Sequence, residues 1–490
     1  MNKFKYIFTI LSLGFVLQSC DTDGLELSNP SQLSPETYFE NEVQVRSAVN
    51  AVYANLQTIG TYSRNYYFMM DNMAHENEGN PQLEANKRLF LDFSFDDSSE
   101  LVNQFWDSSY RGINKANFVI NNEEKINEIP NSLMNQNLKN KYLGEAKFLR
   151  ALYYFNLVTL YGGVPLITVV PENSEGFPRS SVEEVYAQIV TDLTEAAQTL
   201  LPKATEEQGR ATRGAAYALL GKVQLYRENY TEALAAFDNI YDVYQLTDNY
   251  FDNFMEETEH NSETIFGVEF DDDMGNNAFW NSGVSGEGPN EASLRGQSYG
   301  FVDWFNCYPS DHLLEAFEPN DPRYKASFYE IGDTYAGGEL TITEISLGRR
   351  AVWRKYQNYY KDANEDLQSG INFGIIRYAD VLLMMAEAAN ETVDQNTAID
   401  YINEVRDRVD MPLLSYGLSK EAVFEAIVHE RMVELAGEQV RFADLKRWGM
   451  AAQVLSQFGF QSGIHDLLPI PEAEINSNSA LSQEDQNPGY

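Results

Sequence analysis

The sequence predicts a mainly α-helical protein built from about four tetratricopeptide-like helix pairs, with an irregular, loop-rich insertion that contains short strands. Three observations lead to this class. Helical apolar periodicity dominates residues 36–240 and 375–455. One register of small and large apolar residues recurs in these two stretches. Residues 245–372 between them are instead rich in Gly, Asn, Asp and aromatic residues. We therefore expect one domain over residues 36–490.

The N-terminal residues have the pattern of an export signal. Lys3 and Lys5 are followed by an apolar run at 6–17, which is shorter than the roughly 20 residues that a membrane-spanning helix needs. The stretch "LQSC" at 17–20 resembles the lipobox of bacterial lipoproteins, which implies cleavage before Cys20 and acylation of that residue. An ordinary secretory signal with an incidental cysteine is the alternative.

These features predict a signal peptide over 1–19, a tether over 20–35 and a lipid anchor at Cys20. Several acyl chains hold a protein stably on a membrane, whereas one chain does not. Asp21 and Asp23 resemble the acidic signal that sends some Gram-negative lipoproteins to the cell surface. The expected location is therefore the extracellular face of the outer membrane.

The composition excludes several partners. The formal net charge is −39, which repels nucleic acid and disfavours polyanionic ligands. With Cys20 acylated, Cys307 is the second and last cysteine, so no intramolecular disulfide can form. Stability must therefore come from a buried core, in which Cys307 itself is expected as a small apolar residue.

A tetratricopeptide-like register appears twice. In "YALLGKVQLYRENYTEALAAFDNI", which begins at 217, Gly221 lies where a neighbouring helix approaches closely and Phe237 can fill the groove beside it. In "LLMMAEAANETVDQNTAIDYINEV", which begins at 382, Ala386 and Ile402 occupy the same two positions. Two helix pairs are therefore predicted from spacing alone.

Two further pairs and one strand complete the expected elements. Residues 47–57 should pair with 102–120, and residues 141–161 with 181–201. Within the insertion, "TIFGVEF" at 264–270 predicts a strand.

Several long motifs resemble the SusD/RagB family of outer-membrane nutrient-binding lipoproteins. They occur in the family's order and run almost end to end: "WDSSYRGINKANFVI" (106–120), "EAKFLRALYYFNLVTLYGGVPL" (145–166), "RYADVLLMMAEAAN" (377–390), "ERMVELAGEQVRFADLKRWG" (430–449) and "LLPIPEAEINSNSALSQEDQNPGY" (467–490). The resemblance implies four tetratricopeptide-like helix pairs that carry a variable ligand-binding region. It also implies a surface lipoprotein that captures glycan and caps a SusC-like TonB-dependent transporter barrel.

The motif at 430–449 is expected to be structural. Its acidic residues Glu430, Glu434 and Glu438 step by four, as on one face of a helix. Arg431 and Arg441 lie three residues from Glu434 and Glu438, within ion-pairing reach on a helix. We interpret the motif as a packed amphipathic helix. Trp106 and Trp353 are likewise expected to serve packing.

Two motifs that could suggest catalysis are incomplete. His429 and Glu430 begin an HExxH pattern, but Val433 stands where the second zinc ligand would be. Residues 296–300 match G-x-S-x-G, but the polar segment 290–295 before them does not suit the strand that this motif requires, so a loop is expected. We expect no catalytic residue, no metal and no cofactor.

Aromatic side chains with polar neighbours provide the candidates for sugar binding. Pyranose rings stack their C–H faces on aromatic planes, and their hydroxyls require hydrogen-bond partners. The insertion offers Trp280, Trp304, Tyr299 and Arg295. The resemblance implies that the insertion and an early loop build the site together.

The early loop, predicted at 62–80, adds Tyr66, Asp71 and Asn72. For each of these side chains the alternative is ordinary packing in the core.

The sequence thus predicts a non-enzymatic glycan-binding lipoprotein whose partners are a TonB-dependent barrel, a glycan and a membrane, but not nucleic acid. The negative charge favours a neutral glycan such as the β-glucan laminarin over a polyuronate. A scaffold that binds only proteins, a surface glycoside hydrolase and a peptide-import protein are the alternatives.

Overall fold

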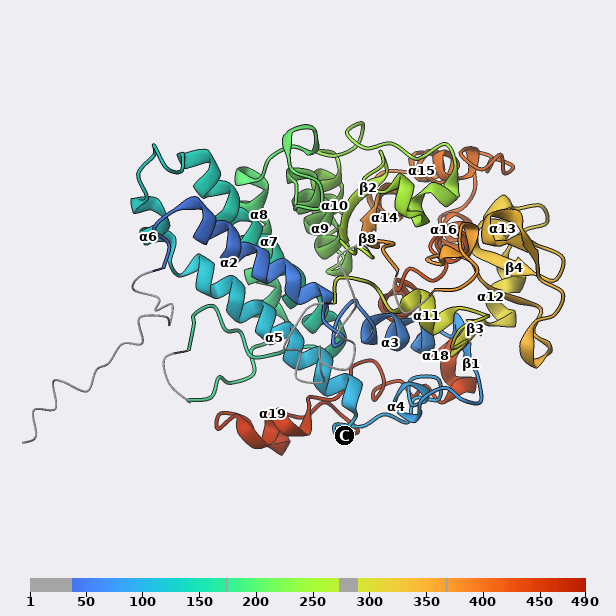
Figure 1. Cartoon of the computed structure of the whole chain (residues 1–490), viewed down its shortest axis with the longest axis horizontal. Helices are drawn as coiled ribbons and strands as arrows, with labels where there is room; N and C mark the ends of the chain where they lie inside the picture. Colours follow the sequence, from blue (N-terminus) through green and yellow to red (C-terminus); the bar gives the residue numbers. More distant parts are fainter. Residues whose placement is uncertain (1–37, 172–174, 273–289, 366–368) are drawn as a thin grey trace, which may run out of the picture.

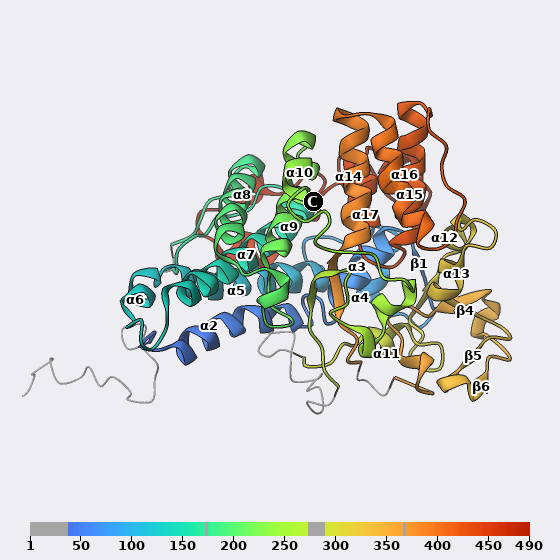
Figure 2. The same cartoon turned by 90° about the horizontal axis from the view of Figure 1, so that it is seen from above.

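The computed structural model describes residues 38–171, 175–272, 290–365 and 369–490 (Figure 1). The predicted signal peptide, the tether, Cys20 and Trp280 lie outside these ranges. Helices dominate, as predicted, and fall into two groups on either side of a small strand pair (Figures 1 and 2). The first group comprises α2 (Glu42–Ala54), α5 (Glu100–Ile120), α6 (Glu123–Glu128), α7 (Gln136–Tyr161), α8 (Val182–Thr199), α9 (Arg213–Tyr226) and α10 (Tyr230–Phe237).

The second group begins after the insertion. It comprises α14 (Tyr378–Thr392), α15 (Gln395–Asp407), α16 (Lys420–Glu434), α17 (Arg441–Arg447) and α18 (Ala451–Leu455). The later helix α19 (Glu472–Ser477) lies instead beside α5 of the first group, where Trp106 donates to Glu474 over 3.4 Å (Figure 1). The remaining described α-helices are short. α3 (Asn65–Met73) and α4 (Ala85–Arg88) lie in the early segment, and α11 (Arg295–Tyr299), α12 (Asp311–Ala316) and α13 (Pro322–Ser327) lie in the insertion. None of the described helices is long and apolar enough to cross a membrane.

All four predicted helix pairs are present. α2 packs on α5, α7 on α8, α9 on α10 and α14 on α15. Local capping fixes where several of these helices begin. Ser181 and Glu184 form a reciprocal capping box at α8, and the side chains of Thr212 and Asp394 cap α9 and α15. Each pair is therefore specified largely by its own residues.

The close approach predicted at Gly221 is confirmed. A Cβ built on Gly221 would lie 2.3 Å from Cε1 of Phe237, and Phe237 is fully buried. In the second pair, Ala386 and Ile402 are both fully buried as well. The small residue in each first helix thus allows its partner helix to approach.

Replacing Gly221 with Val is expected to lower the free energy of unfolding by about 1–3 kcal/mol, because the added side chain would overlap the Phe237 ring. Urea unfolding measures this change. Ala235→Val on the adjacent α10 is the control, since Ala235 is exposed and the substitution should cost about 0.5 kcal/mol. Equal losses in both variants would contradict the packing role of Gly221.

Within the described residues, the strands form four separate antiparallel pairs rather than one sheet. β1 (Asn77–Gly79) pairs with β3 (Cys307–Pro309), β2 (Thr264–Val268) with β8 (Phe373–Arg377), β4 (Phe328–Glu330) with β7 (Ala351–Trp353), and β5 (Thr334–Tyr335) with β6 (Leu340–Thr341). The strand predicted at 264–270 is confirmed as β2. The β1–β3 pair joins the early segment to the insertion, so it brings together the two parts that the sequence nominated for a site.

The motif at 430–449 is structural, but the prediction of one continuous helix is wrong. α16 ends at Glu434 and α17 begins at Arg441, because Gly437 (φ +68°) and Gln439 (φ +62°) adopt left-handed backbone conformations in the turn between them. The predicted ion pairs are replaced by longer-range ones: Glu434 binds Arg323, Arg377 and Arg408, and Arg431 binds Asp380 and Asp444.

Candidate functional site

The early segment and the insertion do meet. The Tyr299 hydroxyl donates to Oδ2 of Asp71 over 3.1 Å, and Nη2 of Arg295 lies 3.6 Å from the same oxygen. Asn77 donates to the Tyr299 hydroxyl over 2.8 Å. Much of the expected early loop is helix α3, which carries Asp71 into this contact. The juxtaposition predicted from the sequence is therefore present.

These residues are nevertheless in the interior, so their assignment as ligand contacts is corrected. Asp71, Asn72 and Tyr299 are fully buried, and Arg295 is 2% exposed. Asn72 donates to the carbonyl of Lys87 over 3.1 Å instead of facing solvent. Side chains without exposed surface offer nothing on which a sugar could stack. They hold the early segment against the insertion.

Arg295 is held mainly by aromatic rings. Its Cζ lies 4.1 Å from the centroid of Tyr356 and 5.4 Å from that of Tyr299, with Tyr67 and Phe373 also within 6 Å. Nη2 donates to the carbonyl of Gly437 over 2.6 Å, which ties this cluster to the turn after α16. Burial raises the pKa of the Tyr299 hydroxyl well above its ordinary value, so this residue acts as a neutral donor.

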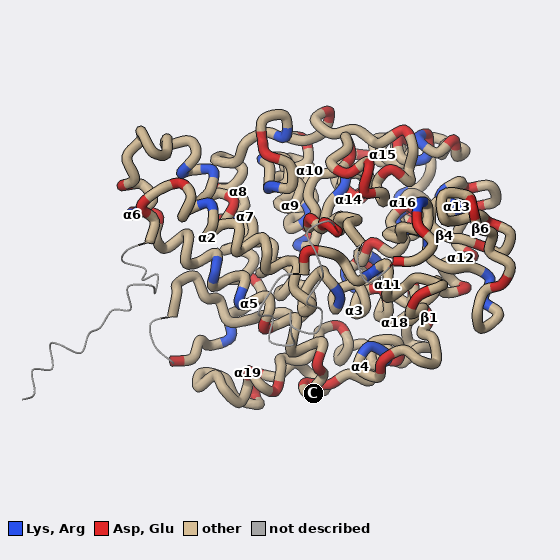
Figure 3. Tube along the Cα trace, viewed as in Figure 1, with Lys and Arg blue, Asp and Glu red and all other residues tan. Residues whose placement is uncertain are grey.

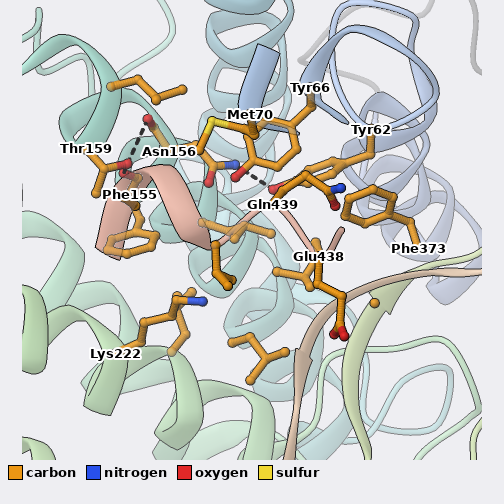
Figure 4. A pocket seen from close by; sticks show the side chains of 18 of the residues that line it. Tyr62, Tyr66, Met70, Phe155, Asn156, Thr159, Lys222, Phe373, Glu438 and Gln439 are labelled. Carbon is orange, nitrogen blue, oxygen red and sulfur yellow. Dashed lines mark hydrogen bonds between the residues drawn. The ribbon is translucent and has the colours of Figure 1, made fainter. Parts of the chain in front are cut away.

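Tyr66 lines an internal cavity (Figure 4). Its ring packs 4.8 Å from Tyr62 and 5.6 Å from Phe105, and Lys222 of α9 and Gln439 line the same space. The cavity volume is about 50 Å³, well below the roughly 300–1,000 Å³ of small-molecule sites. A sugar residue does not fit there, so Tyr66 is also better explained as packing.

Trp304 is a described candidate that remains accessible. It is half-buried and lies in the turn that follows α11. The guanidinium carbon of Arg64 lies 5.3 Å from its ring centroid, and Arg64 in turn forms an ion pair with Glu84 at 2.9 Å. A cation against an indole fixes the ring without covering all of it. Trp304 is thus a pre-oriented aromatic surface.

Further aromatic residues lie beside this turn, and the sequence did not single them out. The Phe301 ring is 5.2 Å from Tyr335 and 4.8 Å from Tyr359, and Val302 is 45% exposed. We call Phe301, Val302, Trp304 and Tyr335 the Trp304 face. Tyr335 comes from the β5–β6 hairpin. The residues "AGG" at 336–338 form its turn, and they are the sequence signal from which this hairpin could have been predicted.

Polar groups border the Trp304 face. Asp303 lies in the same turn, and its Oδ2 accepts from the Tyr359 hydroxyl over 2.5 Å. A carboxylate has several lone pairs, so it can also accept from the hydroxyls of a ligand. Apolar rings flanked by such groups can bind a sugar by stacking and hydrogen bonding together.

The motifs examined for catalysis have structural partners. Ser298 of G-x-S-x-G lies in α11, a short helix rather than the expected loop; it is fully buried and accepts from the Tyr67 hydroxyl over 3.1 Å. Glu430 forms ion pairs with Arg323 and Arg406. Among the described residues, no group of three His, Cys, Asp or Glu side chains is arranged to hold a metal ion. Acidic residues, red in Figure 3, are spread over all parts of the molecule.

Comparison with known proteins identifies two matching family profiles. One is described as "Starch-binding associating with outer membrane" and matches residues 23–225. The other is described as "SusD family" and matches residues 248–490. The chain is also similar to "SusD-like protein P2" of Formosa agariphila, with 26% identity over 100% of both chains.

Solved structures agree. A SusD superfamily protein from Bacteroides vulgatus shares 26% identity with a TM-score of 0.79, over 93% of this chain and 100% of that one. A structure described as a "Laminarin binding SusD-like protein" shares 29% identity with a TM-score of 0.77, over 92% of this chain and 100% of that one.

Proposed function

We propose, from the premise that this chain belongs to the SusD/RagB family, that it is a cell-surface glycan receptor which captures a polysaccharide without cleaving it. Cys20 carries the lipid anchor on the extracellular face of the outer membrane, and a TonB-dependent barrel takes the captured glycan. The Trp304 face provides the binding surface. Trp280, outside the described residues, stays a candidate ligand contact.

The chemistry of the Trp304 face supports this proposal. Its indole is half-buried and oriented by Arg64, and Phe301 of the same turn packs against Tyr335 at 5.2 Å between ring centroids. Such a surface suits a ligand that presents C–H faces and hydroxyls. The net charge of −39 favours a neutral glycan, and a relative described as laminarin-binding makes a β-glucan the first choice.

Replacing Trp304 with Ala is expected to weaken binding at this face about 5- to 150-fold, because loss of a stacking ring typically costs about 1–3 kcal/mol. The probe is laminarihexaose, a neutral β-glucan hexamer, titrated calorimetrically into the mature chain. Trp448→Ala is the matched control. Trp448 is also half-buried, and Arg447 lies 4.7 Å from its ring, but it is at the end of α17.

Equal affinities for the Trp304→Ala variant and the wild type would rule out this face. Release of new reducing ends from laminarin by the purified protein would instead rule out the non-catalytic function. If the purified protein binds neither neutral nor acidic polysaccharides, the alternative of a scaffold that binds proteins is favoured.

A further inference from the structure

A second groove lies between the segment after α10 and the pair α14–α15. In both Figure 1 and Figure 2, α15 is well separated from α11, which precedes the Trp304 face. The groove encloses about 570 Å³, within the roughly 300–1,000 Å³ typical of ligand sites. Its lining includes Tyr241, Tyr378, Glu404 and Arg408.

Tyr241 provides an aromatic wall whose position is fixed. The side chain is half-buried, and its hydroxyl donates to Oε1 of Glu404 over 2.7 Å. The edge-to-face contact with Tyr401, at 5.7 Å between centroids, restrains the ring from another side. A ring held in this way loses little conformational entropy when a ligand stacks on it.

Hydrogen-bond acceptors lie around this wall. Asp242, Asp248 and Asp407 line the groove and are exposed, and none of them forms an ion pair with another described residue. Pairs of carboxylate oxygens can accept from the hydroxyls of a sugar. These acceptors are therefore available to a ligand.

Gln245 adds a donor. Its exposed side-chain amide lines the groove and can both donate and accept hydrogen bonds. Arg408 also lines the groove, but its side chain is only 4% exposed, and Glu434 and Glu263 neutralise its charge at 2.5 and 3.3 Å. Its buried Nε has no hydrogen-bond partner in the described structure, and an ordered water can supply one. Acceptors combined with a donor match a hydroxyl, which both donates and accepts; an ammonium group only donates.

We propose that this groove is a second binding site for a neutral sugar residue, which stacks on Tyr241 and bonds to the surrounding carboxylates. This inference rests on the proposed function of glycan capture but not on the Trp304 face. When one polysaccharide occupies both sites of the protein, the overall affinity rises, because binding at the second site is then intramolecular. The acidic lining excludes uronates from this site.

The test titrates laminarihexaose into the wild type and four variants: Tyr241→Ala, Trp304→Ala, the double variant and Tyr416→Ala. Tyr416 is the matched control, because its hydroxyl also donates to a carboxylate of α15, that of Asp400 at 2.5 Å, yet it does not line the groove. We expect about two hexamers per wild-type chain. The Tyr241→Ala variant should lose one of them, or bind it at least about tenfold more weakly, and Tyr416→Ala should match the wild type.

The outcomes separate the two sites. If Tyr241→Ala binds laminarihexaose as the wild type does, the groove is not a binding site, whatever the result for Trp304→Ala. Loss only in Tyr241→Ala supports the groove and overturns the Trp304 face. Equal loss in Tyr241→Ala and Tyr416→Ala overturns the groove, because it reveals a general effect on α15. Absence of binding by the wild type overturns both sites for this glucan.

Discussion

Replacing Glu434 with Gln should lower the free energy of unfolding by about 3–5 kcal/mol, the cost typical of breaking a buried ion pair on one side. Glu434 is fully buried. Its carboxylate lies 3.0 Å from Nη1 of Arg323, 2.6 Å from Nη1 of Arg377 and 2.5 Å from Nη2 of Arg408. The glutamine is neutral, so the buried guanidinium groups of Arg323, Arg377 and Arg408 all lose the negative charge that Glu434 supplies.

Urea unfolding near pH 7 measures this loss. Glu425→Gln is the matched control, since Glu425 is an exposed carboxylate on the same helix α16 and its replacement should change stability by less than about 0.5 kcal/mol. Similar small changes in the two variants would contradict the central role of Glu434.

The pH dependence gives a second readout. Burial alone would raise the pKa of Glu434, but Arg408, Arg377 and Arg323 hold it well below its ordinary value. The stabilisation is therefore complete above the unfolded pKa of about 4.5 and is lost as the pH falls further. The difference between the wild type and Glu434→Gln should shrink below that pH.

The Glu76→Gln variant should become more stable than the wild type as the pH rises. Burial first, and then the neighbouring Asp71, raise the pKa of Glu76 to about 8. Oε2 of Glu76 accepts from the backbone of Gly437 at 3.3 Å, which a glutamine oxygen can still do. The substitution therefore removes the ionisation while keeping this hydrogen bond.

The sign follows from proton linkage. A carboxyl with a raised folded pKa stays protonated in the folded state while the unfolded chain releases its proton, so its ionisation destabilises the fold from about pH 4.5 to pH 8. The slope reaches about 1.4 kcal/mol per pH unit. Unfolding free energies at pH 5–9 should show Glu76→Gln diverging upward from the wild type and levelling off above pH 8. Parallel curves would show that Glu76 ionises normally.

The helix pairs were predictable because their determinants are local. Gly221 and Phe237 lie within one pair, and capping residues such as Ser181 and Glu184 act within a single turn. The break between α16 and α17 was missed because Gln439, a residue without special turn preference, shares the left-handed conformation with Gly437. The ion partners of Glu434 come from distant segments, which spacing along one helix does not reveal.

The candidate site was predicted less well, for a different reason. Tyr, Asp, Asn and Arg are the residues that bind sugars, but they are also those that join buried segments. The family resemblance correctly implied that the segments of Asp71 and Tyr299 meet, yet the composition that selected these residues carried no information on exposure, and both are fully buried. Trp304 differs because it lies in a turn rather than in a helix that packs on both sides.

The buried contact among Asp71, Arg295 and the Gly437 turn also constrains how this protein matures. These residues are separated by more than 350 positions between the first and the last, yet they share one cluster. Contacts so distant form late, because a long loop must close before they gain any energy. The centre of the fold therefore stays incomplete until nearly the whole chain is available. Such late completion would suit the export proposed above, during which a chain must remain unfolded.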